Sequence, residues 1–175
     1  MRLRKLIPCK SKLILYKTSI LPHLTYCHLA WHFCKASDRR IQERAFRAIY
    51  QSSTTPYQQL LDQAKLPTLY NTRLQDIVIL MYKIKNGLVP DNITEILDTR
   101  NKKYNLTNSD FVIPQFETIR HGKHSLRYIG PYLWSKLNNK EKDKPTLSSF
   151  KNCIRNKDIA FQLEDGCQNC ELCST

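Results

Sequence analysis

Three cysteines near the end of the chain have the spacing of a metal site. Cys167, Cys170 and Cys173 are each separated by two residues. Thiolates at this spacing can share one zinc ion, because the turn between them directs both sulfurs inward. Zinc prefers four ligands, so Glu164, Asp165, a distant histidine or another segment would have to supply the fourth. The pattern predicts either a zinc site or, as the simpler alternative, a tail of free thiols.

Two histidines near the start of the chain have the spacing of a metal-binding helix. His28 and His32 are four residues apart, and Cys27 precedes the first of them. A zinc protease helix would place a glutamate directly after the first histidine as a general base, and Leu29 stands there instead. We therefore interpret these histidines as ordinary helix residues without a metal or catalytic role.

The residue groups that hydrolases and polymerases need are missing from the sequence. The 4 glycines are scattered and form neither a phosphate-binding loop nor a turn that presents a nucleophilic serine. Two-metal nucleotidyl transfer needs closely grouped carboxylates, and no two aspartates are adjacent. The sequence predicts no catalytic residue, no small-molecule substrate and, apart from the possible zinc, no cofactor.

Four arginines form the clearest binding pattern. They are Arg39, Arg40, Arg44 and Arg47. The last three follow four-and-three spacing, so they share one face of a helix, where guanidinium groups can meet successive phosphates. Phe46 and Tyr50 could add stacking, although such rings more often belong to a core. A solvated charged face explains the arginines equally well.

The net charge of the chain is +13, and the charge is unevenly distributed. Residues 1–50 carry 11 basic and 2 acidic side chains, residues 51–100 carry 5 of each, residues 101–158 carry 12 and 5, and residues 159–175 carry 0 and 3. Such an excess attracts polyanions, of which nucleic acid is the commonest. An acidic membrane surface offers the same electrostatics, and a merely soluble basic protein is the plain alternative.

Signals for secretion and membrane insertion are missing from the sequence. The apolar stretch near the N-terminus is interrupted by Pro8, Lys10, Lys12 and Lys17, and no stretch has the uninterrupted apolar length that a bilayer needs. The 7 cysteines therefore indicate reduced thiols rather than a disulfide framework. We predict a nuclear or cytoplasmic protein with no membrane contact.

Apolar residues at helical spacing predict a helical bundle over residues 1–100. The first helix is expected to begin at Ser11 and to kink at Pro22. Its apolar stripe is Leu13, Tyr16, Ile20, Leu24, Cys27 and Trp31. A second helix is expected from Ser37 to Tyr50. Its buried side is Ile41, Ala45, Ala48 and Ile49.

Two further helices complete the predicted bundle. Thr55 and Pro56 begin a short helix, whose apolar residues are Tyr57, Leu60, Leu61 and Ala64. The strongest periodicity follows at Tyr70, Leu74, Ile77, Met81, Ile84 and Leu88. Asn86 and Gly87 end this long helix, and residues 91–97 are expected to form one or two more turns.

Residues 101–158 predict a small β-hairpin followed by two short helices, and residues 159–175 form a cysteine-containing tail. Extended chain at residues 111–118, a turn at His121 and Gly122, and a return through Leu126 and Tyr128 make up the hairpin. Gly130 and Pro131 begin the first short helix, which bears Leu133, Trp134 and Leu137. Pro145 and Thr146 begin the second, with Leu147, Phe150 and Ile154 inside. A second basic set surrounds the hairpin, and we predict that it binds nucleic acid, although a solvated charged surface explains it equally well: Arg120, Lys123, Arg127 and Lys136.

Several segments together resemble the region downstream of the polymerase palm in reverse transcriptases of non-LTR retrotransposons of the LINE-like, jockey type. The segments are LYKTSILPHLTYC at 15–27 with Trp31, QERAFR at 42–47, LQDI at 74–77 with MYK at 81–83, YNL at 104–106 with Asn108, and GPYLW at 130–134 with Phe150 and Lys151. The first segment and the Gly-Pro-x-x-Trp segment are the most specific. The resemblance spans essentially the whole chain.

The resemblance implies a thumb-like helical bundle that grips template and primer. In that family the catalytic aspartates belong to upstream motifs, including a Tyr-x-Asp-Asp type, and none of these motifs is present. We therefore expect a C-terminal fragment of an RNA-directed DNA polymerase that binds RNA or an RNA–DNA duplex, works beside the remainder of a reverse transcriptase, and has no active site of its own. The alternative is a non-catalytic helical module that binds proteins. A self-contained hydrolase lacks the residue cluster it would need.

Overall fold

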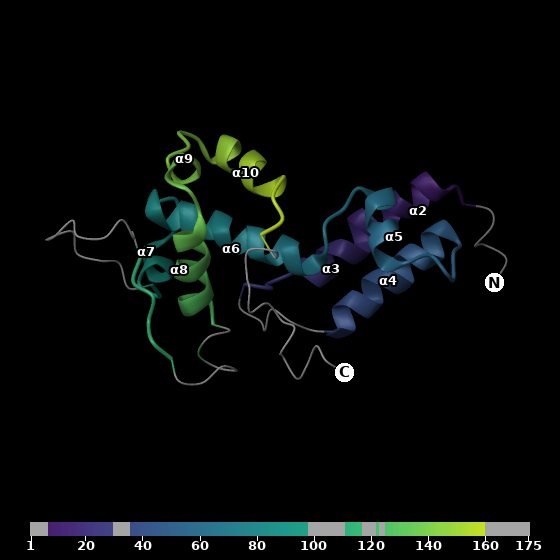
Figure 1. Cartoon of the computed structure of the whole chain (residues 1–175), viewed down its shortest axis with the longest axis horizontal. Helices are drawn as coiled ribbons and strands as arrows, with labels where there is room; N and C mark the ends of the chain where they lie inside the picture. Colours follow the sequence, from purple (N-terminus) through teal and green to yellow (C-terminus); the bar gives the residue numbers. More distant parts are fainter. Residues whose placement is uncertain (1–6, 30–35, 98–110, 117–121, 123–124, 160–175) are drawn as a thin grey trace, which may run out of the picture. The chain divides into compact units, whose positions relative to one another are not determined.

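The computed structural model describes residues 7–29, 36–97, 111–116, 122 and 125–159 (Figure 1). This part of the chain is mainly helical, which confirms the predicted class. Contacts between residues define two compact units, and the division falls between Arg73 and Leu74. We predicted a division after residue 100, which lies outside the described residues. The described residues 74–97 instead belong to the same unit as residues 111–116 and 125–159.

The first helical stretch consists of α2 (Cys9–Leu15), the π-helical segment η1 (Tyr16–Ile20) and α3 (Leu21–Thr25). Its N-cap is Pro8, whose carbonyl accepts a hydrogen bond from the Lys12 amide at 3.1 Å. The prediction that Ser11 caps this helix is wrong, because the helix is already formed at that position. The fixed φ of proline prepares the backbone for a helix start.

The π-helical segment changes which residues of this stretch face the core. Tyr16 is 1% exposed and Leu21 packs against the same core, five residues later, whereas Ile20 is 41% exposed. The predicted stripe assumed a step of four from Tyr16 to Ile20, and a π turn adds one residue. The segment lies directly before Pro22, which has no N–H to continue the ordinary pattern. Cys27 is exposed, and Trp31 lies outside the described residues.

Helices α4 (Ala36–Tyr50) and α5 (Tyr57–Ala64) pack together to form most of the first core. The core of this unit consists of Tyr16, Phe46, Ile49, Leu60, Leu61 and Ala64. The residues predicted on α5 are therefore confirmed, although its N-cap is Pro56 rather than Thr55. Ile41 was expected inside and is 43% exposed, because Gln42 occupies the buried position beside it.

Helix α6 (Leu69–Lys85) is buried on nearly every side rather than along one stripe. Of the predicted positions, Tyr70 is half-buried and four are buried: Leu74, Ile77, Met81 and Ile84. Val78, Ile79 and Tyr82 are buried in addition. The helix ends as expected at Gly87, which has φ 64 and donates its amide hydrogen to the Ile84 carbonyl at 3.2 Å. Leu88 is 55% exposed, because it follows this turn and is no longer part of the helix. One turn, α7 (Asp91–Thr94), follows.

The predicted hairpin is replaced on its return side by a helix. Residues 112–116 carry no strand, and Leu126 and Tyr128, expected in the returning strand, belong to α8 (Leu126–Lys136). Gly130 and Pro131 therefore lie inside this helix instead of beginning it. The lack of a side chain at Gly130 lets the backbone of α8 approach Met81 of α6 closely, since a Cβ at this position would stand 2.7 Å from the Met81 sulfur. Thr118 and His121 lie outside the described residues.

Two shorter helices complete the second unit, α9 (Asn139–Lys142) and α10 (Leu147–Arg155). The predicted start of α10 is confirmed, because Thr146 accepts a hydrogen bond from the Ser149 amide at 3.2 Å. Its predicted inner residues Phe150 and Ile154 are buried. Phe150 stacks on Tyr82 with ring centroids 4.3 Å apart and contacts Trp134 at 6.0 Å, so α10 packs against both α6 and α8.

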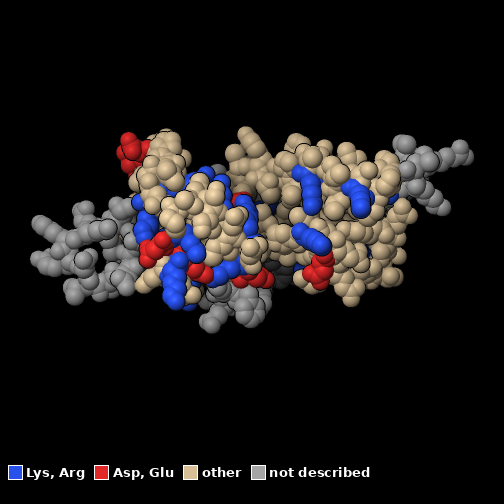
Figure 2. Space-filling model, turned by 90° about the horizontal axis from the view of Figure 1, so that it is seen from above, with Lys and Arg blue, Asp and Glu red and all other residues tan. Residues whose placement is uncertain are grey.

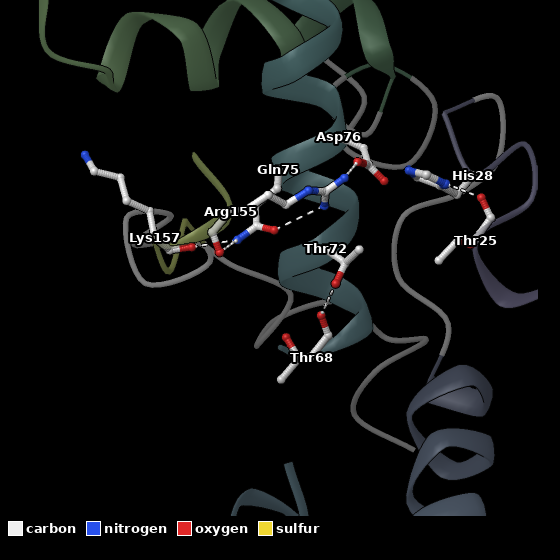
Figure 3. A network of polar contacts seen from close by, with 8 residues as sticks. All are labelled: Thr25, His28, Thr68, Thr72, Gln75, Asp76, Arg155 and Lys157. Carbon is white, nitrogen blue, oxygen red and sulfur yellow. Dashed lines mark hydrogen bonds and ion pairs between the residues drawn. The ribbon is translucent and has the colours of Figure 1, made fainter. Parts of the chain in front are cut away.

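A polar contact fastens the end of α10 to α6 (Figure 3). The buried Gln75 amide nitrogen donates to the carbonyls of Arg155 at 3.3 Å and Lys157 at 2.8 Å, and its amide oxygen accepts from the Arg155 guanidinium at 3.3 Å. Arg155 also forms an ion pair with Asp76. Because buried polar groups are costly without partners, this arrangement fixes where the chain leaves α10.

Candidate nucleic-acid interface

The arginines of α4 lie on the side of the helix away from the core. At about 100° per residue, Arg40, Arg44 and Arg47 fall within one narrow stripe, opposite the buried Gln42, Phe46 and Ile49. Arg40 and Arg44 are exposed and Arg47 is half-buried. We call these three residues, Arg40, Arg44 and Arg47, the α4 arginine stripe.

Arg47 and Arg39 each contact a neighbouring side chain. Arg47 donates to Glu43 at 2.7 Å, one helical turn earlier. The Arg39 guanidinium lies over the Tyr57 ring, 5.3 Å from its centroid, so Arg39 stands at the α5 edge of the helix rather than in the stripe. Sequence analysis missed the role of Glu43, although its i,i+4 spacing from Arg47 was the available signal.

The stripe is supported from beneath by a polar contact between α4 and α5. The Tyr57 hydroxyl donates to the side-chain oxygen of Gln42 at 2.5 Å, and Tyr16 packs on Phe46 with centroids 5.0 Å apart. Burial raises the pKa of Tyr57, with Tyr16 raising it further and Arg39 lowering it. The hydroxyl therefore stays protonated and able to donate. These contacts fix the rotation of α4, and with it the direction of the arginines.

Two residues of the second predicted basic set are described, and they do not share one face of a helix. Arg127 and Lys136 are both on α8, but nine residues of helix rotate the chain by about 900°, which places them on opposite sides. Lys136 lies over the Tyr132 ring, 5.5 Å from its centroid. Arg120 and Lys123 lie outside the described residues. The two described members of the set therefore lie on different sides of α8, and nucleic-acid binding by the set stays a prediction.

A pair of lysines at Trp134 was not foreseen from the sequence. Lys85 lies 5.6 Å and Lys142 lies 6.0 Å from the ring centroid of Trp134, and Lys142 is only 8% exposed. Lys85 is also 3.9 Å from Asp143. These two ammonium groups lie over an aromatic core residue. They come from α6 and α9, and no regular spacing in the sequence predicts that the two lysines meet at the same ring. They act in packing rather than as part of a basic surface.

No group of three or more potential metal ligands occurs among the residues that the structure describes. Cys167, Cys170 and Cys173 lie outside them, so the zinc site remains a prediction. His32 also lies outside. Nδ1 of His28 contacts the Thr25 carbonyl, as an ordinary helix-end histidine does (Figure 3). Cys9, Cys27 and Cys153 are free thiols.

The space-filling view shows that the basic side chains on the visible face stand as separate groups, several of them beside carboxylates (Figure 2). Within the described part of the chain, no helix is long and apolar enough to cross a bilayer.

The chain matches no family model, no curated protein and no solved structure.

Proposed function

We propose that the chain is the nucleic-acid-binding C-terminal region of a non-LTR retrotransposon reverse transcriptase, and that the α4 arginine stripe is its phosphate-binding face. One observation carries the proposal. The three guanidinium groups lie on one side of α4, and the opposite side is held in the core by Phe46 and Ile49. A fixed helix presents the cations in register, which lets them meet neighbouring phosphates without ordering a loop first.

Charge and sequence resemblance add independent support. The net charge of +13 raises the local concentration of any polyanion, and salt-dependent binding to a phosphate backbone is its usual consequence. The resembling segments imply RNA or an RNA–DNA duplex as the ligand. Because α4 contributes side chains to phosphates and none to base edges in this proposal, binding has little sequence preference.

The proposal contains no nucleotide chemistry. Polymerisation needs carboxylates grouped around divalent metal ions, and the sequence has no adjacent aspartates and no motif of the Tyr-x-Asp-Asp type. The chain is proposed to act beside the catalytic remainder of a reverse transcriptase. It needs no small molecule and no membrane, and it works in the nucleus or cytoplasm.

Binding to a labelled RNA–DNA duplex tests the proposal. We expect the wild type to bind tightly at low salt and much more weakly at moderate salt, and a variant with Arg40, Arg44 and Arg47 changed to Glu to lose most of the low-salt affinity. A matched control changes Lys10, Lys12 and Lys17 to Glu, which removes the same charge from α2 and η1. Equal losses in both variants, or an affinity that ignores salt, would contradict the proposal.

The exposed apolar residues of α2 favour a second candidate, a helical module that binds proteins. Ile14 is 60% and Leu15 is 52% exposed, although both are large aliphatic side chains. An Ile14→Asp, Leu15→Asp variant separates the candidates. It would abolish a protein interaction made by this face and leave duplex binding intact, whereas the α4 charge reversal would do the opposite.

A further inference from the structure

Helix α8 carries three consecutive contacts between aromatic rings and a lysine on its outer side. The Tyr128 and Tyr132 rings are stacked at 5.9 Å with only 10° between their planes. Phe116 contacts Tyr128 at 6.4 Å, and Lys136 covers Tyr132 at 5.5 Å. We call these four residues the α8 ring stack. It consists of Phe116, Tyr128, Tyr132 and Lys136.

The ring stack is held in place by the packing of α8. Tyr128, Tyr132 and Lys136 are four residues apart and follow one side of the helix, while Gly130, Leu133, Trp134 and Leu137 face the core on the other side. The three rings are half-buried and Lys136 is exposed. At the α8 end of the stack, the described side chain that lies over the Tyr132 ring is the flexible Lys136.

We propose that the Tyr132 end of the α8 ring stack binds an unpaired base of single-stranded nucleic acid, with Lys136 moving to the phosphate of the same strand. A lysine over a half-buried ring is a weak contact, and a stacked base is a stronger one that every base can make. The displaced ammonium keeps a favourable partner, since a single strand always supplies a phosphate near its base. A base pair inside a duplex has its faces stacked already and cannot occupy this site.

Charge complementarity favours a nucleic acid over a protein as the occupant. The described residues 74–97, 111–116, 122 and 125–159 hold 10 basic and 6 acidic side chains, so this unit attracts a polyanion. The combination of aromatic faces with a nearby cation is the usual basis of single-strand binding without sequence preference. The inference rests on the proposed function, because both require nucleic acid as the ligand. The site on α8 binds a single strand, whereas the α4 arginine stripe binds a duplex.

The test compares three labelled ligands on the full chain by fluorescence anisotropy: single-stranded oligo(U), an abasic strand of the same length, and an RNA–DNA duplex. We expect the wild type to prefer oligo(U) over the abasic strand, and Tyr132→Ala to bind oligo(U) about fivefold more weakly with little change for the duplex. Tyr132→Phe keeps the ring and is expected to lose less. Lys136→Gln should lower the salt slope of oligo(U) binding by about one.

Tyr26→Ala is the control, because Tyr26 is 73% exposed and belongs to the other unit. Circular dichroism of each variant checks that the helices remain. The ring-stack inference is overturned if Tyr132→Ala retains the wild-type preference for oligo(U) over the abasic strand, or if it weakens all three ligands equally. Loss of all binding through the α4 charge reversal alone, with Tyr132→Ala unchanged, would overturn the inference and leave the proposed function standing. A wild type that binds none of the ligands would overturn both.

Discussion

Helices α4 and α8 both carry basic residues that the sequence pattern predicted to contact phosphates, yet only α4 presents them on one side. On α4 the spacing of four and three residues aligns Arg40, Arg44 and Arg47 opposite the core. On α8 the spacing of nine residues places Arg127 and Lys136 on opposite sides. Helical phase, rather than the number of basic residues, therefore decides whether a basic segment can contact a phosphate backbone at several points.

The largest expected effect concerns the cores beneath the two helices. Trp134→Ala should lower the free energy of unfolding by about 3–5 kcal/mol, because Trp134 is 1% exposed and contacts Phe150 and Phe111. The affinity of the α4 arginine stripe for duplex should remain, since its support is Phe46 in the other unit. Urea unfolding and duplex binding measure the two quantities.

Phe46→Ala is the matched change in the first unit. It should lower the free energy of unfolding by a similar amount and also weaken duplex binding, because it removes the ring on which the orientation of α4 depends. Duplex binding that falls with Trp134→Ala and persists with Phe46→Ala would contradict the division of roles between the helices.

A smaller loss of stability is expected from Gln75→Leu. The change leaves the Arg155 and Lys157 carbonyls without their donor, which should lower the free energy of unfolding by about 1–3 kcal/mol. Asp76→Asn is the control, since it weakens the ion pair with the partly exposed Arg155 but leaves the Gln75 hydrogen bonds in place, and it should cost less than Gln75→Leu. Equal effects in urea unfolding would mean that Gln75 does not hold the end of α10.

Paired substitutions test the comparison of α4 with α8 directly. Changing Arg40 and Arg44 to Gln should weaken duplex binding about tenfold at low salt, because two aligned phosphate contacts are lost. Changing Arg127 and Lys136 to Gln removes the same charge from two sides of α8 and should have a clearly smaller effect. Similar losses in duplex binding assays would show that total charge, and not phase, sets the affinity.

The smallest effect is expected at Glu43. Glu43→Gln removes the ion pair with Arg47 and should strengthen duplex binding about twofold to threefold, since the guanidinium no longer has a competing carboxylate. Asp62→Asn on α5 is the control, because Asp62 is exposed outside the stripe. Weaker duplex binding by Glu43→Gln would mean that the ion pair positions Arg47 for the phosphate.

The helices and much of the core follow from the sequence where apolar spacing is regular. The buried residues predicted on two helices are confirmed, namely Leu60, Leu61 and Ala64 on α5 and Phe150 and Ile154 on α10, since one face of each helix is apolar. The end of α6 was also predictable from the sequence, because Gly87 readily adopts the positive φ that ends a helix.

The errors have two physical causes. The π turn before Pro22 inserts a residue into the first helix, and spacing rules that assume an α-helix cannot show it. In α8, Pro131 lies inside a helix that its sequence pattern would begin there, because the close approach of Gly130 to Met81 and the burial of Leu133 and Trp134 outweigh the lost hydrogen bond. Because part of this segment was predicted as a hairpin, the sequence did not show that Arg127 and Lys136 lie on opposite sides of one helix.

The salt dependence of duplex binding tests the central claim most directly. Each phosphate contact contributes about 0.9 to the slope of log affinity against log salt concentration. The α4 arginine stripe therefore predicts that changing Arg40, Arg44 and Arg47 to Gln lowers the wild-type slope by between two and three, or about 2.7. An unchanged slope in this variant would show that the arginines of α4 do not contact phosphates.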